Sequence, residues 1–344
     1  MARDYAELHG ELRSVARELL TKGDPGPGTL AQAGWAGLEI PDALGGAGVS
    51  FAETAVILEE LGRAGSATGY LGAVLGIGAL LELPADEARD GWLTATAAGD
   101  PAPVAVLRTG DTAGIVFTLK DSQLDGYAEF VPDAAAAPLL LVLARDSGGA
   151  PVLAAVGPDA HGVAVTAQPV LDETRRLATV RADSAPVQQV WHFAGDPETA
   201  AQRLADRAAL AVACDSLGVA EAMLAATVDY VSVRHQFGRP IGSFQAVKHA
   251  CADMAVRIRV TRQLVDAAVD ELSEGAPASR AASMAKAYAC DTAVQVAGKA
   301  MQLHGGIGYT WESGVHVYLK RAALNRSLFG SPTAHRKALA VRYG

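Results

Sequence analysis

The feature that most constrains the fold is a helical pattern of apolar residues that begins after Pro197 and continues almost to the end of the 344-residue chain. Apolar side chains recur there at three- and four-residue spacing, which is the period of an amphipathic helix, as at Met254, Ile258, Val265 and Val269. The pattern predicts three long helices, over 198–235, 244–273 and 277–304. Long antiparallel helices joined by short loops pack as a bundle.

Two segments of different character precede this part. Residues 5 to 95 have a helical period that a turn-rich stretch at 40–48 interrupts. From 101 to about 195, short β-type runs are separated by Pro, Gly and Asp, which favours an antiparallel barrel or sandwich over a parallel α/β unit. The sequence therefore predicts an α+β fold with a helical domain at 1–98, a β domain at 99–196 and a C-terminal helical bundle at 197–344.

Charge narrows the classes of partner. The net charge of −9 argues against non-specific nucleic-acid binding. Residues 1–200 carry 12 basic and 27 acidic side chains, whereas residues 201–344 carry 17 and 11. The C-terminal part is therefore where an anionic ligand such as a nucleotide would bind, although ordinary variation between domains explains such a difference nearly as well.

Cysteine content and apolar runs indicate a compartment. The three cysteines, Cys214, Cys251 and Cys290, are too few and too scattered for a disulfide framework or a zinc site, so we expect a reducing cytoplasm. The longest strongly apolar run, Tyr70 to Leu81, is shorter than the roughly 18 residues of a membrane span. We expect it to be a buried helix, and we expect no targeting segment and no membrane partner.

Several common catalytic motifs are missing from the sequence. It has no Gly-x-Ser-x-Gly elbow, no Walker sequence and no His or Cys pair at metal-binding spacing. The Gly-Ile-Gly triplets at 76–78 and 306–308 lack the third glycine of a dinucleotide fingerprint, and neither follows a predicted strand. Nucleotide binding in the Rossmann manner is therefore not expected.

Two segments between the long helices could bind an anionic ligand. In the loop at 234–245, Arg234 could pair with a pyrophosphate, Gln236 could hydrogen-bond to it, and Phe237 could stack on a ring. A helix cap followed by a Gly-Pro turn would also explain this loop if it stood alone. At 302–309, glycines would let a ligand approach the backbone, and Gln302 is placed to contact a ribose or adenine.

Together these segments resemble the C-terminal signature of the acyl-CoA dehydrogenase family, and the resemblance extends to 41–48, 124–126, 130–134 and 171–175. It implies a helical domain, a β domain and a four-helix bundle, with FAD bound between two subunits. It also implies which residues hold the adenosine and pyrophosphate end of a flavin whose ring lies mainly in the neighbouring chain, namely Arg234, Gln236, Phe237, Gln245, Gln302, Gly305 and Gly306.

The resemblance breaks at the catalytic base. The family removes the substrate's α-proton with a glutamate, because the α-proton of a thioester is far from acidic at neutral pH. One family position for this glutamate falls on Leu328 or Phe329, and the other falls on Ala208. Asp206 and Asp215 are nearby acids on the same predicted helix, and Asp215 is the better outside candidate for a base. The family's substrate-side arginine falls on Ala209, with Arg207 beside it.

A third departure concerns the flavin ring. Family members usually carry a Thr-Glu-Pro-x-x-Gly-Ser-Asp stretch early in the β domain and a Trp-x-Thr stretch soon after, and the segment between Gly99 and Asp121 has neither. We therefore hypothesise that the chain completes the FAD site of a second acyl-CoA dehydrogenase-like subunit. In this it resembles the actinobacterial α2β2 enzymes that act on steroid side-chain CoA esters. The alternatives are a homomeric enzyme with Asp215 or Asp206 as a displaced base, and a flavin-free assembly subunit.

Overall fold

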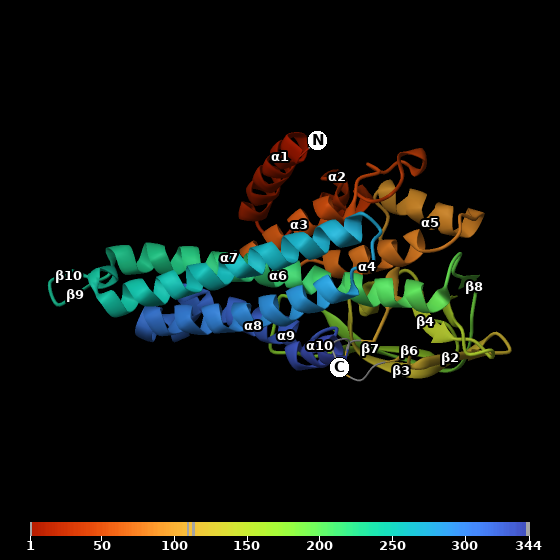
Figure 1. Cartoon of the computed structure of the whole chain (residues 1–344). Coiled ribbons are helices and arrows are strands. Elements are labelled where there is room, and N and C mark those ends of the chain that lie inside the picture. Colours follow the sequence, from red (N-terminus) through yellow and green to blue (C-terminus); the bar gives the residue numbers. More distant parts are fainter. Residues whose placement is uncertain (1, 109, 112–113, 342–344) are drawn as a thin grey trace.

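Three groups of elements follow one another in the computed structural model, which describes residues 2–108, 110–111 and 114–341 (Figure 1). Helices come first, a sheet follows, and long helices complete the chain. Helix gives way to strand between Ala97 and Val104, and strand gives way to helix between His192 and Pro197. The predicted α+β fold is confirmed, while the division into domains at 98/99 and 196/197 remains a proposal.

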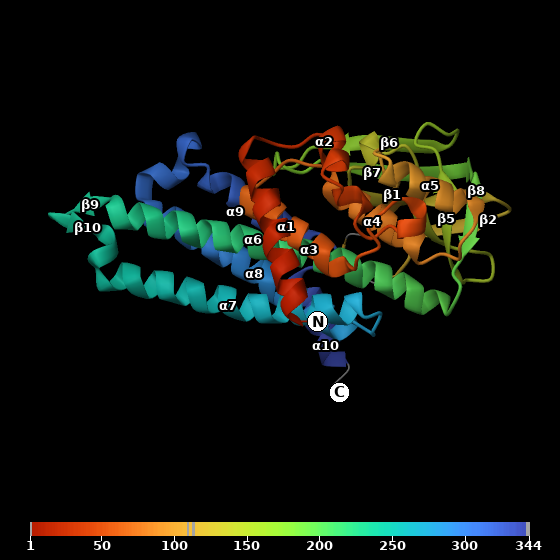
Figure 2. The same cartoon turned by 90° about the horizontal axis from the view of Figure 1, so that it is seen from above.

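The N-terminal helices pack along one side of the helical bundle (Figure 2). They are α1 (Ala2–Thr21), α2 (Pro27–Gln32), α3 (Phe51–Ala64), α4 (Tyr70–Leu81) and α5 (Glu87–Ala97). A capping box starts α3. The Ser50 hydroxyl accepts a hydrogen bond from the backbone N–H of Glu53, and the Glu53 carboxylate accepts one from the backbone N–H of Ser50. Helix α4 is almost entirely buried, as its apolar run predicts.

The sheet has eight strands in the order β6-β7-β3-β2-β4-β5-β8, with β1 added beside β4. The strands are β1 (Val104–Val106), β2 (Phe117–Lys120), β3 (Gln123–Pro132), β4 (Leu140–Arg145), β5 (Pro151–Val156), β6 (Val163–Gln168), β7 (Leu177–Pro186) and β8 (Gln189–His192). The expectation of purely antiparallel pairing was wrong for strand β4, which runs parallel to both β1 and β2. Strand β3 folds back on β2 as a hairpin, and the chain then passes to the other side of β2, where β4 pairs parallel to it.

The bundle contains α6 (Pro197–Val233), α7 (Gln245–Ser273), α8 (Ser279–His304) and α9 (Val315–Ser327), followed by α10 (Pro332–Val341). The three helices predicted from periodicity are α6, α7 and α8, so that prediction is confirmed. Asp196 caps α6 by accepting a hydrogen bond from the Thr199 N–H, and Pro197 occupies its first turn. Helix α6 is long and apolar enough to cross a membrane, but 78% of its most apolar window is buried inside the protein, as in a core helix.

Two glycines let α3 and α6 cross at close range. A Cβ atom on Gly62 would lie 2.0 Å from the backbone oxygen of Asp215, and one on Gly218 would lie 1.9 Å from that of Glu59. Both distances are far inside van der Waals contact, so the crossing tolerates no side chain at either position. The N-terminal helices are therefore held directly against the middle of α6.

A buried ion-pair cluster on Asp215 joins all three parts of the chain. Arg321 of α9 donates to its carboxylate at 2.6 Å, the Arg175 guanidinium of the loop before β7 lies 3.0 Å away, and the Asn325 amide donates at 2.6 Å. Arg321 also donates to the carbonyl of Ser66, which follows α3, at 2.8 Å. Burial raises the pKa of Asp215, but Arg175 and Arg321 outweigh it and hold that pKa at about 2.

We expect Gly218→Ala to lower the free energy of unfolding by more than about 1 kcal/mol, because overpacking forces the two helices apart. Gly298 in α8 is the matched control, since a Cβ there would meet nothing within 4 Å. Gly298→Ala should raise stability by about 0.5–1 kcal/mol through helix propensity. Chemical denaturation measures both changes, and equal effects of the two substitutions would contradict the close crossing.

Replacing the central carboxylate should destabilise the fold strongly. Asp215→Asn removes the carboxylate that pairs directly with the buried Arg321 and Arg175, so we expect a loss of about 3–5 kcal/mol in the free energy of unfolding. The control is Glu198→Gln, which breaks the exposed pair with Arg145 and should cost less than about 1 kcal/mol. A cost for Asp215→Asn as small as that of the control would mean that the cluster is not structural.

The same carboxylate should make stability depend on pH. Its folded pKa of about 2 lies below the ordinary value of 3.8 for an aspartate, so its charge stabilises the protein above pH 4, and this stability is lost as the pH falls towards 2. The loss amounts to about 2 kcal/mol. Denaturation between pH 4 and 2 should therefore show a steeper fall in stability for the wild-type protein than for Asp215→Asn.

Candidate functional site

The residues predicted to bind the adenosine end of FAD gather at the end of the bundle that lies far from the sheet (Figure 1). Two strands of two residues each, β9 (His235–Gln236) and β10 (Arg239–Pro240), form a small hairpin between α6 and α7. The rings of Tyr230 in α6 and His304 in α8 stack with centroids 4.5 Å apart. This contact brings the end of α8 beside the hairpin, so the two predicted segments come together in the folded chain.

The side chains of this hairpin point outward. Phe237 is 91% exposed, and its backbone has a positive φ of 52° at the hairpin tip. Its ring packs edge-on against Phe244 at 6.2 Å, and the Arg239 guanidinium lies 4.1 Å from the Phe244 ring centroid. Arg234, Gln236 and Gln245 are also exposed.

The second segment offers an open backbone. Gln302 is exposed and accepts a hydrogen bond from Lys299 at 2.8 Å. Gly305 has a φ of +64°, and a Cβ on Gly305 or Gly306 would meet no atom within 4 Å. A cation, amides, an exposed ring and accessible glycine backbone fit the pyrophosphate and adenosine end of FAD. Binding by these residues remains a prediction.

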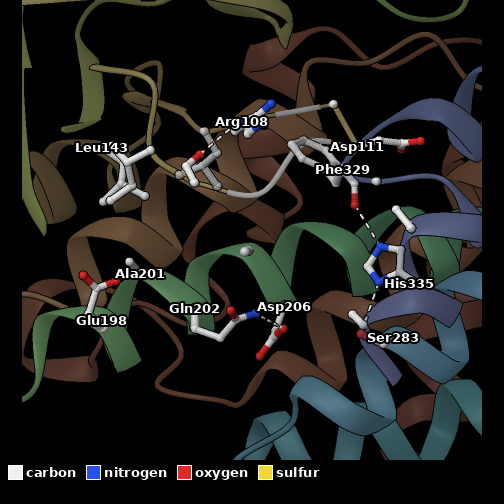
Figure 3. Close-up of a pocket in the computed structure, with 18 of the residues that line it drawn as sticks. Arg108, Asp111, Leu143, Glu198, Ala201, Gln202, Asp206, Ser283, Phe329 and His335 are labelled. Atoms are coloured by element: carbon white, nitrogen blue, oxygen red, sulfur yellow. Dashed lines mark hydrogen bonds between the residues drawn. The ribbon is translucent and has the colours of Figure 1, made fainter. Parts of the chain in front are cut away.

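A cavity of about 390 Å³ lies at the opposite end of the bundle, between the helices and the sheet (Figure 3). Its walls come from the segment after β1, from β4, from the start of α6 and α8, and from the chain around α10. The lining includes Leu107, Arg108, Leu143, Gln202, Asp206, Ser283, Phe329 and His335. Two regions that depart from the family pattern therefore line the cavity, namely the segment between Gly99 and Asp121 and the residue Phe329.

The positions where the resemblance predicts the family's glutamate carry buried apolar side chains. Phe329 is 7% exposed, Leu328 is 2% exposed and Ala208 is fully buried. The loop that carries Leu328 and Phe329 is tied down, because the buried Lys286 ammonium donates to the Gly330 carbonyl at 2.8 Å. The carboxylate of Asp111 accepts a hydrogen bond from the backbone N–H of Ser331 at 2.6 Å.

The two candidate aspartates have different surroundings. Asp215 is 1% exposed and bound to Arg321, Arg175 and Asn325, so the geometry gives it a structural role instead of that of a base. Asp206 lines the cavity and accepts hydrogen bonds from Gln202 at 2.8 Å and from Ser279 at 2.5 Å. Only Asp206 of this pair faces a space that a ligand could enter.

The side chain of Arg207 is also fully engaged in structural contacts. It is buried and makes two hydrogen bonds to Glu39, at 2.8 and 2.5 Å, and its guanidinium lies 4.7 Å from the Phe51 ring centroid. Ala209, at the family's arginine position, is also buried. This part of α6 therefore presents no arginine to the cavity.

Sequence reasoning missed His335 and Ser283. His335 Nδ1 lies 3.2 Å from the Ser283 hydroxyl, and Nε2 lies 2.9 Å from the Phe329 carbonyl oxygen (Figure 3). Burial lowers the pKa of His335. No local motif marks these residues, because they are 52 positions apart and meet only through the packing of α10 on α8.

Known proteins resemble the chain along almost its whole length. The family model for the acyl-CoA dehydrogenase N-terminal domain matches residues 4–100, and that for the C-terminal domain matches residues 198–344. The acyl-CoA dehydrogenase IpdE2 of Mycobacterium tuberculosis is 35% identical over 308 residues, which cover 88% of this chain and 80% of that protein.

Two solved structures have the same fold. The Tcur3481-Tcur3483 steroid ACAD G363A variant has a TM-score of 0.89 and 28% identity, with 97% of each chain covered. The ChsE4-ChsE5 complex from Mycobacterium tuberculosis has a TM-score of 0.86 and 25% identity, with 97% of this chain and 96% of that chain covered. The chain therefore belongs to the acyl-CoA dehydrogenase family, whose members are oxidoreductases that bind FAD.

Proposed function

We propose that this chain is the subunit without a catalytic base in a heteromeric, FAD-dependent acyl-CoA dehydrogenase of α2β2 composition, and that it completes the FAD site of its partner subunit. The observation that carries the proposal is the buried apolar side chain at each position where the family has its glutamate, Leu328, Phe329 and Ala208. The partner supplies the glutamate, the CoA pocket and most contacts to the flavin ring.

The chemistry explains why a partner is needed. The family removes an α-proton and transfers a hydride from the β-carbon of an acyl-CoA thioester, and FAD accepts that hydride when it is bound. Proton removal requires a positioned base, because the thioester α-proton is far from acidic at neutral pH. Asp215 cannot serve while its carboxylate neutralises two buried arginines.

The distance between the two candidate regions supports a shared site. Asp206 at the cavity and Arg234 at the bundle end are separated by 28 residues of one continuous helix. At 1.5 Å per residue they lie about 42 Å apart, which is longer than an extended FAD molecule. Arg234, Gln236, Phe237 and Gln302 would therefore bind the pyrophosphate and adenosine of a flavin whose ring belongs to another chain.

The named relatives suggest the substrate class. One structural neighbour is described as a steroid ACAD with two gene products in its name, and another is a complex of ChsE4 with ChsE5. On this basis we propose α,β-dehydrogenation of the CoA ester of a steroid side chain, in the cytoplasm. A flavin-free assembly subunit would not need the exposed Arg234 and Gln302, so we favour the flavin-binding role.

Co-expression with an acyl-CoA dehydrogenase-like partner tests the proposal. We expect a one-to-one complex, with one FAD per pair of subunits, that oxidises a steroid side-chain acyl-CoA, whereas the chain alone is inactive. Native mass spectrometry gives the subunit ratio, and flavin absorbance gives the FAD content. A homotetramer of this chain that binds one FAD per subunit and turns over substrate would overturn the proposal.

Arg234→Ala should lower the FAD content of that complex, because the pyrophosphate loses a charge-assisted hydrogen bond that contributes about 1.5–3 kcal/mol. This corresponds to a loss of roughly tenfold or more in FAD affinity. Arg280→Ala is the matched control, since Arg280 is an exposed arginine at the other end of α8. Equal FAD affinity in both variants would remove Arg234 from the site.

Asp206→Asn separates the heteromer from a homomeric enzyme with a displaced base. We expect the substitution to leave kcat of the complex within about threefold of wild type. If Asp206 were the base, its loss would reduce kcat by about 100-fold or more. Steady-state kinetics on the purified complex distinguishes these outcomes, and circular dichroism checks that the variant is folded.

A further inference from the structure

A second cavity lies between helices α1, α3, α6 and α7. Its volume is about 440 Å³, and the residues described in its lining all belong to these four helices. His9 and Arg13 come from α1, Glu59 from α3, Cys214 from α6 and Asp266 from α7. Because α1 lies on the outside of the molecule over α3 (Figure 1 and Figure 2), it forms the outer wall of this cavity.

Charged contacts hold α1 against α3. Three basic side chains on α1 each pair with a glutamate on α3. The glutamate side chains are no more than 6% exposed, whereas the basic side chains are between 23% and 52% exposed. The acidic partners therefore belong to the body of the protein, and the basic partners belong to a surface helix. The pairs are His9 with Glu53 at 2.9 Å, Arg13 with Glu59 at 3.6 Å, and Arg17 with Glu60 at 2.8 Å.

The apolar contact of α1 is small by comparison. Among residues 7–21, Ala16 alone is buried. Leu12, Leu19 and Leu20 pack against the core but are only partly buried. Hydrophobic stabilisation follows the apolar area removed from water, so the ion pairs contribute an unusually large share of what holds this helix in place.

The chain is anchored directly after α1 and can turn just before the anchor. Asp24 accepts hydrogen bonds from the Ser66 hydroxyl at 2.7 Å and from the Ala67 N–H at 2.9 Å, which fixes it to the segment after α3. Between this anchor and the end of α1 at Thr21 lies Gly23, which has a φ of +118° and open space where a Cβ would be. Glycine adopts such angles without strain, so the backbone at Gly23 can turn while Asp24 stays in place.

We propose that α1 is a hinged cover that its ion pairs with α3 hold closed, and that its rotation about Gly23 opens the cavity as an acidic cleft between α3 and α7. Once the cations of α1 leave, the charged groups described in the lining are the carboxylates of Glu59, Asp266 and Asp270 and the guanidinium of Arg262. The cover requires neither a partner subunit nor FAD, so it is independent of the proposed function.

Salt should weaken the closed state selectively. The glutamates regain water when α1 leaves, so opening does not strand a charge in the interior. The Debye length falls from about 10 Å at 0.1 M salt to about 3 Å at 1 M, which weakens pairs between exposed charges. The Asp215 cluster is screened much less, because both side chains of the Asp215–Arg321 pair are 1% exposed. High salt should therefore release α1 before the rest of the fold loosens.

Two cysteines report separately on the cover and on the fold. Cys214 lines the cavity and is 1% exposed. Burial raises the pKa of its thiol well above the usual value, so the thiol reacts slowly while the cover is closed. Cys290 is fully buried beside the Ser216 hydroxyl at 3.4 Å, outside the described lining of the cavity. Opening of α1 exposes Cys214 alone, whereas global unfolding exposes both cysteines.

Labelling of the purified full-length chain with N-ethylmaleimide tests the cover. Mass spectrometry reads the rate for each cysteine from its own peptide, and the rate follows the population of the opened form. Between about 0.05 and about 1 M NaCl we expect the rate at Cys214 to rise about tenfold, or about 1.4 kcal/mol shared by three ion pairs, and the rate at Cys290 to change less than about twofold. A salt-independent rate at Cys214, or parallel rises at both cysteines, would overturn the proposal.

A variant of Arg17 assigns the closed state to the ion pairs. Arg17→Gln removes the two hydrogen bonds to Glu60, so the rate at Cys214 in low salt should rise about fivefold, and the further rise with salt should shrink. The double variant Arg17→Gln/Glu60→Gln leaves no buried carboxylate without its partner. It should show the same rise at Cys214.

Arg326→Gln is the matched control. Arg326 is about as exposed as Arg17 and pairs with Asp291 at 2.8 Å, but this pair joins α9 to α8. The control should leave the rate at Cys214 unchanged, and Cys290 shows in every variant whether the protein has stayed folded. An equal rise in the control, or an unchanged rate in both Arg17 variants, would refute the role of the ion pairs.

Discussion

The carboxylate of Asp215 neutralises two buried guanidinium groups, and the relative placement of the three parts of the chain depends on this interaction. Arg321 comes from α9, Arg175 comes from the loop before β7, and the Ser66 carbonyl that Arg321 also binds follows α3. Removing the carboxylate deprives both buried arginines of their direct ion-pair partner, which costs several kcal/mol. The cluster therefore couples the bundle, the sheet and the N-terminal helices into one unit.

Helix α6 sets the distance between the cavity and the exposed end of the bundle. It carries Asp206 at the cavity, Asp215 at the ion-pair cluster and, just past its last turn, Arg234 at the exposed end. Gly218 locks α3 against the middle of the helix, so its central turns cannot shift independently of the N-terminal helices. At 1.5 Å per residue, the helix places its exposed end about 42 Å from Asp206, so that end does not reach the cavity of its own chain.

The sequence allowed the bundle to be predicted better than the sheet. Helices α6, α7 and α8 have a strong period of apolar residues, and Pro and Gly mark their ends. The ten-residue strands β3 and β7 are hard to recognise in the sequence because many of their side chains are exposed, and register shifts interrupt their pairing near Gly126. The parallel pairing of β4 with β2 joins strands that are not consecutive in the chain, and no local sequence pattern predicts such pairing.

The candidate site also has a part that the sequence allowed to be predicted and a part that it did not. The segments at 234–245 and 302–309 are contiguous and could be found as motifs, whereas the cavity is assembled from residues far apart in sequence, such as Ser283 and His335. The loop that carries Leu328 and Phe329 is firmly held. Its backbone makes hydrogen bonds with Lys286, Asp111 and His335. These contacts keep Phe329 in a left-handed backbone conformation that costs about 1–3 kcal/mol. Packing of this kind fixes the wall of the cavity that Phe329 forms.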